Sequence, residues 1–369
     1  MSARSKNVQM HAGASHAEHP HHRSLRALAE ARRHLRGWSL KLIAYAVLAF
    51  LVLRLTPTFK QALHNITHVK WQWLAVMLGL ETLSEIGFVV SWRAIVDRDR
   101  LLEREGRGHR LSSRVAWAQL GGGLLVPGGS YSGLGVGAWM LHRLGMPIRQ
   151  ITERQFSLSF LNTAVDALAL IFCGLGLAVG ILAGKGDLAL TALPAAVGAA
   201  GVGAALLVAR HARGRAQRLR ERRPRVATAI DTLSSAVEDT EKLLVHRAEW
   251  RSVAGAAAYL AFDVLVLYVA FAAIRAHTTP SFADVLMAYI IGALGGSLPL
   301  PAGVGAVGGI GGFLILYGAA HNAAVAAAVI YGAIGLIVPL IGGAIAYLFL
   351  RHEFAGVVAA AAGSVSPAA

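Results

Sequence analysis

Residues 115–142 read VAWAQLGGGLLVPGGSYSGLGVGAWMLH, and residues 285–318 read VLMAYIIGALGGSLPLPAGVGAVGGIGGFLILYG. Both stretches are apolar and rich in glycine, and each contains proline and glycine near its middle. Proline removes a helical hydrogen bond, and glycine costs about 1 kcal/mol relative to alanine in a helix. Each stretch is therefore predicted to form two short helices joined by a break. At membrane depth a non-helical break survives only inside protein or beside water, so both breaks indicate the protein interior.

The overall composition indicates that a membrane surrounds most of the chain. Of its 369 residues, 55% are hydrophobic and only 15% are charged, which is too apolar for a water-soluble domain. A helix needs about 20 apolar residues to cross a bilayer. Six segments are predicted to cross: 38–55, 71–91, 156–182, 188–209, 252–274 and 323–350. We therefore expect an all-α polytopic membrane protein with six full transmembrane helices and two re-entrant broken-helix hairpins.

The basic residues predict which side of the membrane each loop occupies. With a cytoplasmic N-terminus, 30 of the 35 Lys and Arg residues fall on the cytoplasmic side, as the positive-inside rule requires. The net charge of +15 thus has a topological cause, and we expect no nucleic-acid partner. Both termini are expected to be cytoplasmic. The predicted regions are a disordered, basic N-terminal region (1–37), a transmembrane domain (38–350) that includes a basic and amphipathic cytoplasmic segment (210–251), and a short C-terminal tail (351–369).

The two broken stretches also resemble each other. A shift of 174 residues superposes six identical residues within sixteen positions. The pairs are Pro127 and Pro301, Gly122 and Gly296, Leu124 and Leu298, Gly129 and Gly303, Gly135 and Gly309, and Gly137 and Gly311. In this topology the first stretch enters from the cytoplasm and the second from outside, which predicts an inverted repeat of the kind found in secondary transporters. The alternative is a pair of close-packed helix crossings, since small residues let membrane helices approach.

Two longer segments carry a family resemblance. One joins VPGGSYSGLGVGAWMLHRLGMP (126–147) to ITERQFSLSFLNTAVDAL (151–168), and the other begins YIIGALGGSLPLPAGVGAVGG at Tyr289. They resemble the lysylphosphatidylglycerol synthase transmembrane region, or flippase-like domain family, over roughly residues 40–350. The resemblance implies a bacterial integral membrane protein that translocates an anionic or aminoacylated lipid between leaflets. The family signature P-x-P-G-G-[IV]-G is matched by Pro299, Pro301, Gly303, Val304 and Gly305, with Ala302 replacing its first glycine.

The chain departs from this family in the charges that it places inside the membrane. Family members commonly carry an acidic residue shortly after the signature, where residues 306–309 here read AVGG. An arginine is common in their last span, where residues 330–332 here read IYG. Both changes put the usual headgroup chemistry of the family in question. No soluble aminoacyltransferase domain is expected after the last span, so we expect no enzymatic activity.

The two breaks are the predicted binding site for a lipid headgroup. Backbone amides at the start of a half-helix, together with the positive end of its dipole, are suited to bind a phosphate. The predicted substrate-binding residues are Pro127, Gly128, Gly129, Ser130, Tyr131 and Ser132 at the first break, and Pro299, Pro301, Gly303 and Gly305 at the second. Glu153 and Arg154 are added at the cytoplasmic mouth of the following span, where the family often has charged residues. A salt bridge between these neighbours is the alternative.

Four acidic residues lie within the apolar segments and are candidates for proton or cation coupling: Glu81, Glu85, Asp166 and Asp263. Ionisable groups at membrane depth cost several kcal/mol and by default indicate a pathway or a partner. Glu81 and Glu85 are four residues apart, so they share one helical face and repel each other when both are ionised. The alternative for all four is a structural role in hydrogen bonds between helices.

Two main functional hypotheses follow, and neither is enzymatic. The first is a lipid translocase of the cytoplasmic membrane, with a cavity lined by the two breaks. The second is a non-catalytic accessory or scaffold subunit for a lipid-modifying or glycosyl-transferring enzyme, which would then be a partner. A transporter of small solutes is a third. Membrane phospholipids are the expected ligands, and the single cysteine and the motifs indicate no cofactor and no metal site.

Overall fold

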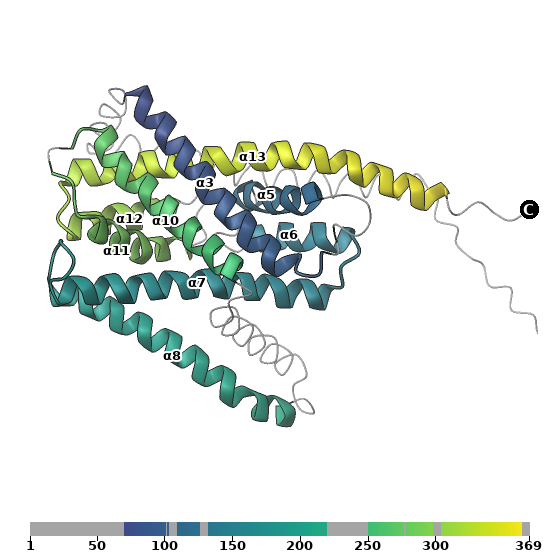
Figure 1. The fold of residues 1–369 in the computed structure, drawn as a ribbon, viewed down its shortest axis with the longest axis horizontal. Coiled ribbons are helices and arrows are strands. Elements are labelled where there is room, and N and C mark those ends of the chain that lie inside the picture. The colour runs from purple at the N-terminus through teal and green to yellow at the C-terminus, as the bar shows by residue number, and fades with distance from the viewer. Residues whose placement is uncertain are drawn as a thin grey trace, which may run out of the picture. The chain divides into compact units, whose positions relative to one another are not determined.

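A computed structural model describes residues 70–100, 102, 109–125, 132–219, 250–276, 278–297 and 304–363. All of these residues belong to one compact unit, residues 57–369. Within the described ranges the regular structure is entirely helical (Figure 1). The predicted first span, residues 38–55, lies outside the described residues.

Five helices are long and apolar enough to cross a membrane, which makes the chain a multi-pass α-helical membrane protein. They are α3 (Trp71–Val96), α7 (Ile148–Ala178), α8 (Leu188–Leu219), α10 (Trp250–Ala273) and α13 (His321–Gly363). Of these, α10 is the most buried and α8 the least. Shorter helices form the rest: α5 (His109–Leu125), α6 (Ser132–Arg143), α11 (Phe282–Ala293), the 3-10 helix η3 (Leu294–Ser297) and α12 (Val304–Leu316).

The helices differ from the predicted spans mainly at their ends. The predicted span 156–182 is shifted, because α7 starts at Ile148 with polar residues and ends at Ala178. Gly180 follows with a φ of +78°, a conformation that glycine adopts without strain and that stops the helix. Three other helices, α3, α8 and α13, continue past the predicted ends of their spans at 91, 209 and 350.

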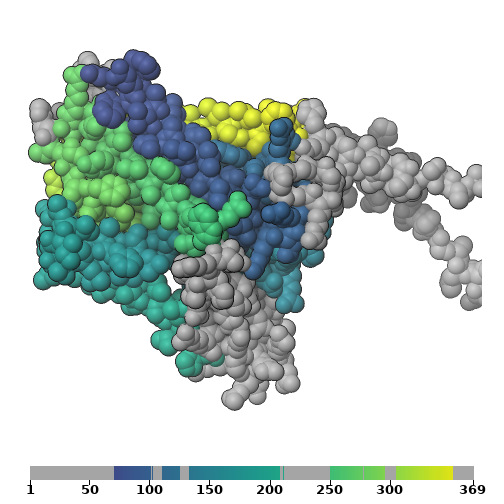
Figure 2. All heavy atoms as spheres, in the orientation of Figure 1, coloured from purple at the N-terminus to yellow at the C-terminus, as the bar shows by residue number. Residues whose placement is uncertain are grey.

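The centre of the bundle is the crossing of α3 and α10, which Figure 2 shows adjoining on one face of the molecule. Gly87 and Gly255 lie at the crossing. A Cβ atom added to Gly87 would lie 2.7 Å from the backbone nitrogen of Tyr259 and 2.8 Å from the carbonyl oxygen of Gly255. The Ser84 hydroxyl donates a hydrogen bond of 2.8 Å to the carbonyl of Tyr259. The absence of two side chains therefore brings the two backbones into contact.

Two pairs of short helices fold back on themselves beside the long ones. In the first pair, α5 and α6 are in contact, and Gly133 of α6 lies against Gly123 of α5. In the second pair, Gly309 of α12 lies against Gly292 of α11. Two prolines lie inside long helices and outside these pairs: Pro194 in α8 and Pro339 in α13.

The packing of the first set of helices recurs in the second. The starts of corresponding helices are separated by nearly constant distances in sequence: 173 residues from His109 to Phe282, 172 from Ser132 to Val304, and 173 from Ile148 to His321. The contacts correspond too: α6 packs on α7 as α12 packs on α13, and α5 packs on α13 as α11 packs on α7. Figure 1 shows α5 and α6 towards one end of α7 and along the middle of α13, and α11 and α12 towards the opposite end of both long helices.

Candidate functional site

Three acidic residues are buried where α3 meets α10. Glu81 and Glu85 lie on α3, and their side chains are each 4% exposed. Asp263 lies on α10 and is 6% exposed. It is close enough to interact electrostatically with both glutamates. The structure thus brings together residues that are about 180 positions apart in the sequence.

Asp263 is held by two tyrosines from other helices. Tyr289 of α11 donates a hydrogen bond of 2.5 Å to its Oδ2 atom, and Tyr331 of α13 donates one of 3.1 Å to the same oxygen. The two rings meet edge to face, with centroids 5.9 Å apart. Sequence reasoning missed both tyrosines as site residues. The signal available in the sequence was a hydroxyl-bearing ring within an apolar span. Tyr331 also lies at one of the positions, 330–332, where the resembled family commonly has an arginine.

The buried carboxyl groups keep oxygen atoms without a partner. Among the described residues, Oε2 of Glu81, Oε2 of Glu85 and Oδ1 of Asp263 are buried and accept no hydrogen bond. Within these same ranges, none of the three forms an ion pair. Glu81 faces α13, since a Cβ atom on Gly335 would lie 3.5 Å from its Oε1 atom. A buried charge without a counter-charge is costly, so this arrangement calls for a bound proton or cation.

The fourth predicted acidic residue, Asp166, comes from α7 and is half-buried. It too lies within electrostatic range of Asp263. Asn162, one turn earlier on α7, has a buried side-chain oxygen without a hydrogen-bond partner in the described part of the chain. All four predicted coupling residues therefore belong to one neighbourhood, which we call the acidic cluster (Glu81, Glu85, Asp166 and Asp263).

A second buried polar group holds the first hairpin in place, and the sequence did not reveal it. The side-chain amides of Gln119 (α5) and Gln155 (α7) bond to each other reciprocally, at 3.1 and 2.8 Å. The indole of Trp92 (α3) donates to the same Gln119 oxygen at 2.9 Å. Gly137 of α6 leaves room for this pair, because a Cβ atom there would lie 2.9 Å from Nε2 of Gln155. The three helices are thereby joined through one network.

Most of the predicted headgroup residues lie outside the described residues: Pro127, Gly128, Gly129, Ser130, Tyr131, Pro299, Pro301 and Gly303. Two others are placed at the edges of the breaks. Ser132 is the first residue of α6, and Gly305 is the second residue of α12. Each of these helices therefore begins next to a predicted break.

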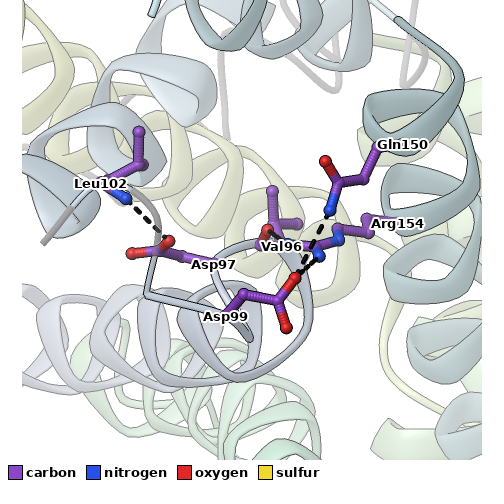
Figure 3. A network of polar contacts seen from close by, with 6 residues as sticks. All are labelled: Val96, Asp97, Asp99, Leu102, Gln150 and Arg154. Atoms are coloured by element: carbon purple, nitrogen blue, oxygen red, sulfur yellow. Dashed lines mark hydrogen bonds and ion pairs between the residues drawn. The ribbon is translucent and has the colours of Figure 1, made fainter. Parts of the chain in front are cut away.

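Glu153 and Arg154 do not pair with each other. Figure 3 shows Arg154 reaching from α7 to the end of α3, where it forms an ion pair with Asp99 and donates 2.7 Å to the carbonyl of Val96. Glu153 pairs with Arg149 at 2.8 Å, one turn away on the exposed side of α7. The guanidinium of Arg154 thus supports the carboxyl end of α3, where unpaired carbonyls favour a cation.

The fold and the site together define a class of protein. It is a polytopic helical bundle with unneutralised acidic side chains at its centre. The chain belongs to the family described as the lysylphosphatidylglycerol synthase TM region, which it matches over residues 39–343. The match confirms the resemblance found in the sequence and extends from before α3 into α13. It is consistent with a membrane protein whose function concerns lipids. A comparison with curated proteins found no match.

Proposed function

We propose that the protein moves an anionic or aminoacylated phospholipid between the leaflets of a bacterial cytoplasmic membrane, without catalysing a chemical reaction. The observation that carries this proposal is the matched packing of two helical hairpins around the same pair of long helices, each hairpin having a Pro-Gly sequence between its two arms. Breaks of this kind line substrate paths in membrane transporters. Membership of a lipid-associated family favours a lipid as the substrate.

The direction of the helices supports an inverted repeat. Along the α3–α10 crossing, Ser84 meets Tyr259, whereas Ser91 lies against Gly255. As residue numbers rise in α3 they fall in α10, so these corresponding helices run antiparallel. One half of the protein begins with α3 and the other with α10, so the two halves are oppositely oriented. The two hairpins then enter the membrane from opposite sides.

The ends of the bundle support the orientation with a cytoplasmic N-terminus. Arg114 of α5 stacks on the ring of Phe349 of α13, and Arg154 joins the start of α7 to the end of α3. At the other end Lys185, in the α7–α8 loop, donates 2.9 Å to the carbonyl of Leu316. Because arginines concentrate at the first end, the positive-inside rule assigns that end to the cytoplasm.

A headgroup phosphate fits the chemistry of both breaks. The second arm of each hairpin, α6 or α12, starts beside its break, and a helix start offers free amide groups and the positive end of the dipole. In an inverted repeat these two helix starts approach the middle of the membrane from opposite sides. A lipid headgroup could then be bound at one break and passed to the other, while its chains stay in the bilayer.

The test uses purified protein in phospholipid vesicles that contain a trace of phosphatidylglycerol labelled on its headgroup. Reduction of the label from outside reports how fast lipid from the inner leaflet becomes accessible. Wild-type protein is expected to accelerate this exchange, and Gly129→Val or Gly303→Val to abolish it by blocking a break. Gly135→Val and Gly312→Val are matched controls in the same hairpins, because a Cβ atom at either position meets nothing within 4 Å. Exchange at the wild-type rate in both break variants would reject the proposed path.

The accessory-subunit hypothesis remains the second candidate for one specific reason. Helix α12, which begins at Val304 within the family signature, reads VGAVGGIGGFLIL and carries no polar side chain to bind a headgroup. An accessory subunit would require no such group. Wild-type protein that moves no labelled lipid alone, but is recovered in a complex with a lipid synthase or glycosyltransferase, would favour this second function.

A further inference from the structure

The acidic cluster has the features of a binding site for a small cationic species. Glu81, Glu85 and Asp263 are each more than nine-tenths buried, and each has an oxygen atom that accepts no hydrogen bond from the described residues. These are three independent buried acceptors, contributed by two crossing helices. Placing even one uncompensated carboxylate in such surroundings costs several kcal/mol. A structural role would have paired these oxygens with donors.

The acidic cluster lies in an equivalent position relative to each of the two hairpins. Tyr259 lies 174 residues after Glu85, the same shift that superposes the two broken stretches. The two residues therefore occupy equivalent positions on α3 and α10, and both lie at the crossing of these helices. A pseudo-two-fold axis that exchanges the hairpins must pass near this pair. An event here can act on both halves of the protein.

One hydrogen bond connects the cluster to the second hairpin, and another connects it to the long helix α13. Oδ2 of Asp263 accepts from Tyr289 on α11 and from Tyr331 on α13. When a proton from water binds the free Oδ1 atom, the negative charge that both hydroxyl groups stabilise is lost, and both hydrogen bonds weaken. When the proton leaves, they strengthen again. Occupancy of Asp263 thus changes how firmly α11 and α13 are held to α10.

We propose that Glu81, Glu85 and Asp263 form a proton-exchange site at the centre of the bundle, and that Tyr289 transmits its protonation state to the second hairpin and Tyr331 transmits it to α13. The other titratable groups that face the site are Asp166 from α7 and Tyr259 from α10. The use of this exchange to drive lipid movement rests on the proposed function, whereas proton binding itself does not.

A proton fits this site better than a metal ion. In the described ranges, no group of three or more His, Cys, Asp or Glu residues converges well enough to hold a metal ion. Proton exchange needs no convergence, because each carboxyl group binds its proton singly and affects the others through its charge. Sodium is nevertheless included in the test as the competing ligand.

Infrared spectroscopy of the full-length protein in detergent tests proton binding without any transport assay. The C=O band of protonated carboxyl groups is recorded from acid to alkaline pH. We expect a band that titrates, and that loses amplitude in each of the variants Glu81→Gln, Glu85→Gln and Asp263→Asn, because each variant removes one carboxyl group. Ser91→Ala is the control, because it removes a buried hydroxyl group of α3 that bonds nothing in the described structure. Its titration should match the wild type.

Transmission to the second hairpin is tested with Tyr289→Phe, and transmission to α13 with Tyr331→Phe. Each change should leave the amplitude of the band unchanged but shift the midpoint of its titration by on the order of one pH unit, because a hydrogen bond to Asp263 is lost. A band that does not titrate, or that is the same in all three carboxyl variants, would overturn the proton site. A band that sodium suppresses at constant pH would overturn it in favour of a cation site. Unshifted midpoints in both tyrosine variants would overturn the transmission.

Discussion

The α3–α10 crossing provides the sharpest test of how the centre of the bundle is built. A Cβ atom on Gly87 would lie 2.7 and 2.8 Å from two backbone atoms of α10, and backbone atoms cannot turn aside as a flexible side chain can. Ordinary carbon contacts begin near 3.5 Å, so Gly87→Ala must push the helices apart by about 0.7 Å. Overpacking of this kind costs about 1–3 kcal/mol.

The matched control is Gly79→Ala, two turns earlier on the same helix. A Cβ atom there meets nothing within 4 Å. Alanine also has the higher helix propensity, by about 1 kcal/mol. We therefore expect Gly79→Ala to be neutral or stabilising. Because both glycines lie inside α3, the gain in helix propensity is common to both variants, and they should differ by the overpacking cost of about 1–3 kcal/mol in the free energy of unfolding.

Unfolding of the purified protein in mild detergent, followed by tryptophan fluorescence as a denaturing detergent is added, measures this difference. Gly87→Ala should unfold at a lower midpoint than the wild type, and Gly79→Ala at the same or a higher one. Equal midpoints for the two variants would mean that the backbones are not in contact at Gly87. The position of the acidic cluster between these helices would then lose its structural basis.

Two further predictions concern the hairpins. Gly309→Ala should destabilise the protein by about 1–3 kcal/mol, because its Cβ atom would meet the backbone of Gly292 in the other arm of the hairpin. The control Gly308→Ala should not destabilise it, because a Cβ atom at Gly308 faces open space. Equal detergent-unfolding midpoints for the two variants would contradict the packing of α11 on α12. Gln119→Leu should cost about 2–4 kcal/mol, because it leaves buried polar groups of its two hydrogen-bond partners without a bond. A thermal unfolding temperature equal to that of the wild type would show that this network does not anchor the first hairpin.

Hydropathy predicted which segments cross the membrane more reliably than where their helices end. The starts at Trp71 and Leu188 were correct, because apolar residues begin there together with the helix. The start of α7 was not, because its first turns are polar. Intrahelical hydrogen bonds do not depend on lipid, so a helix continues into water until a residue such as Gly180 stops it.

The candidate site was only partly visible in the sequence. A charged residue in an apolar span is a strong signal, which is why all four members of the acidic cluster were predicted individually. Their neighbours Tyr289 and Tyr331 were not, because aromatic residues are common in spans and only the fold brings these two to Asp263. The pairing of Gln119 with Gln155 was hidden for the same reason.

The most direct measurement is the initial rate at which headgroup-labelled phosphatidylglycerol leaves the inner leaflet of vesicles that contain this protein and no other. Lipid translocation through the two breaks predicts a rate above that of protein-free vesicles, which falls to the protein-free level with Gly303→Val and stays high with Gly312→Val. A wild-type rate equal to that of protein-free vesicles would contradict translocation by the protein alone.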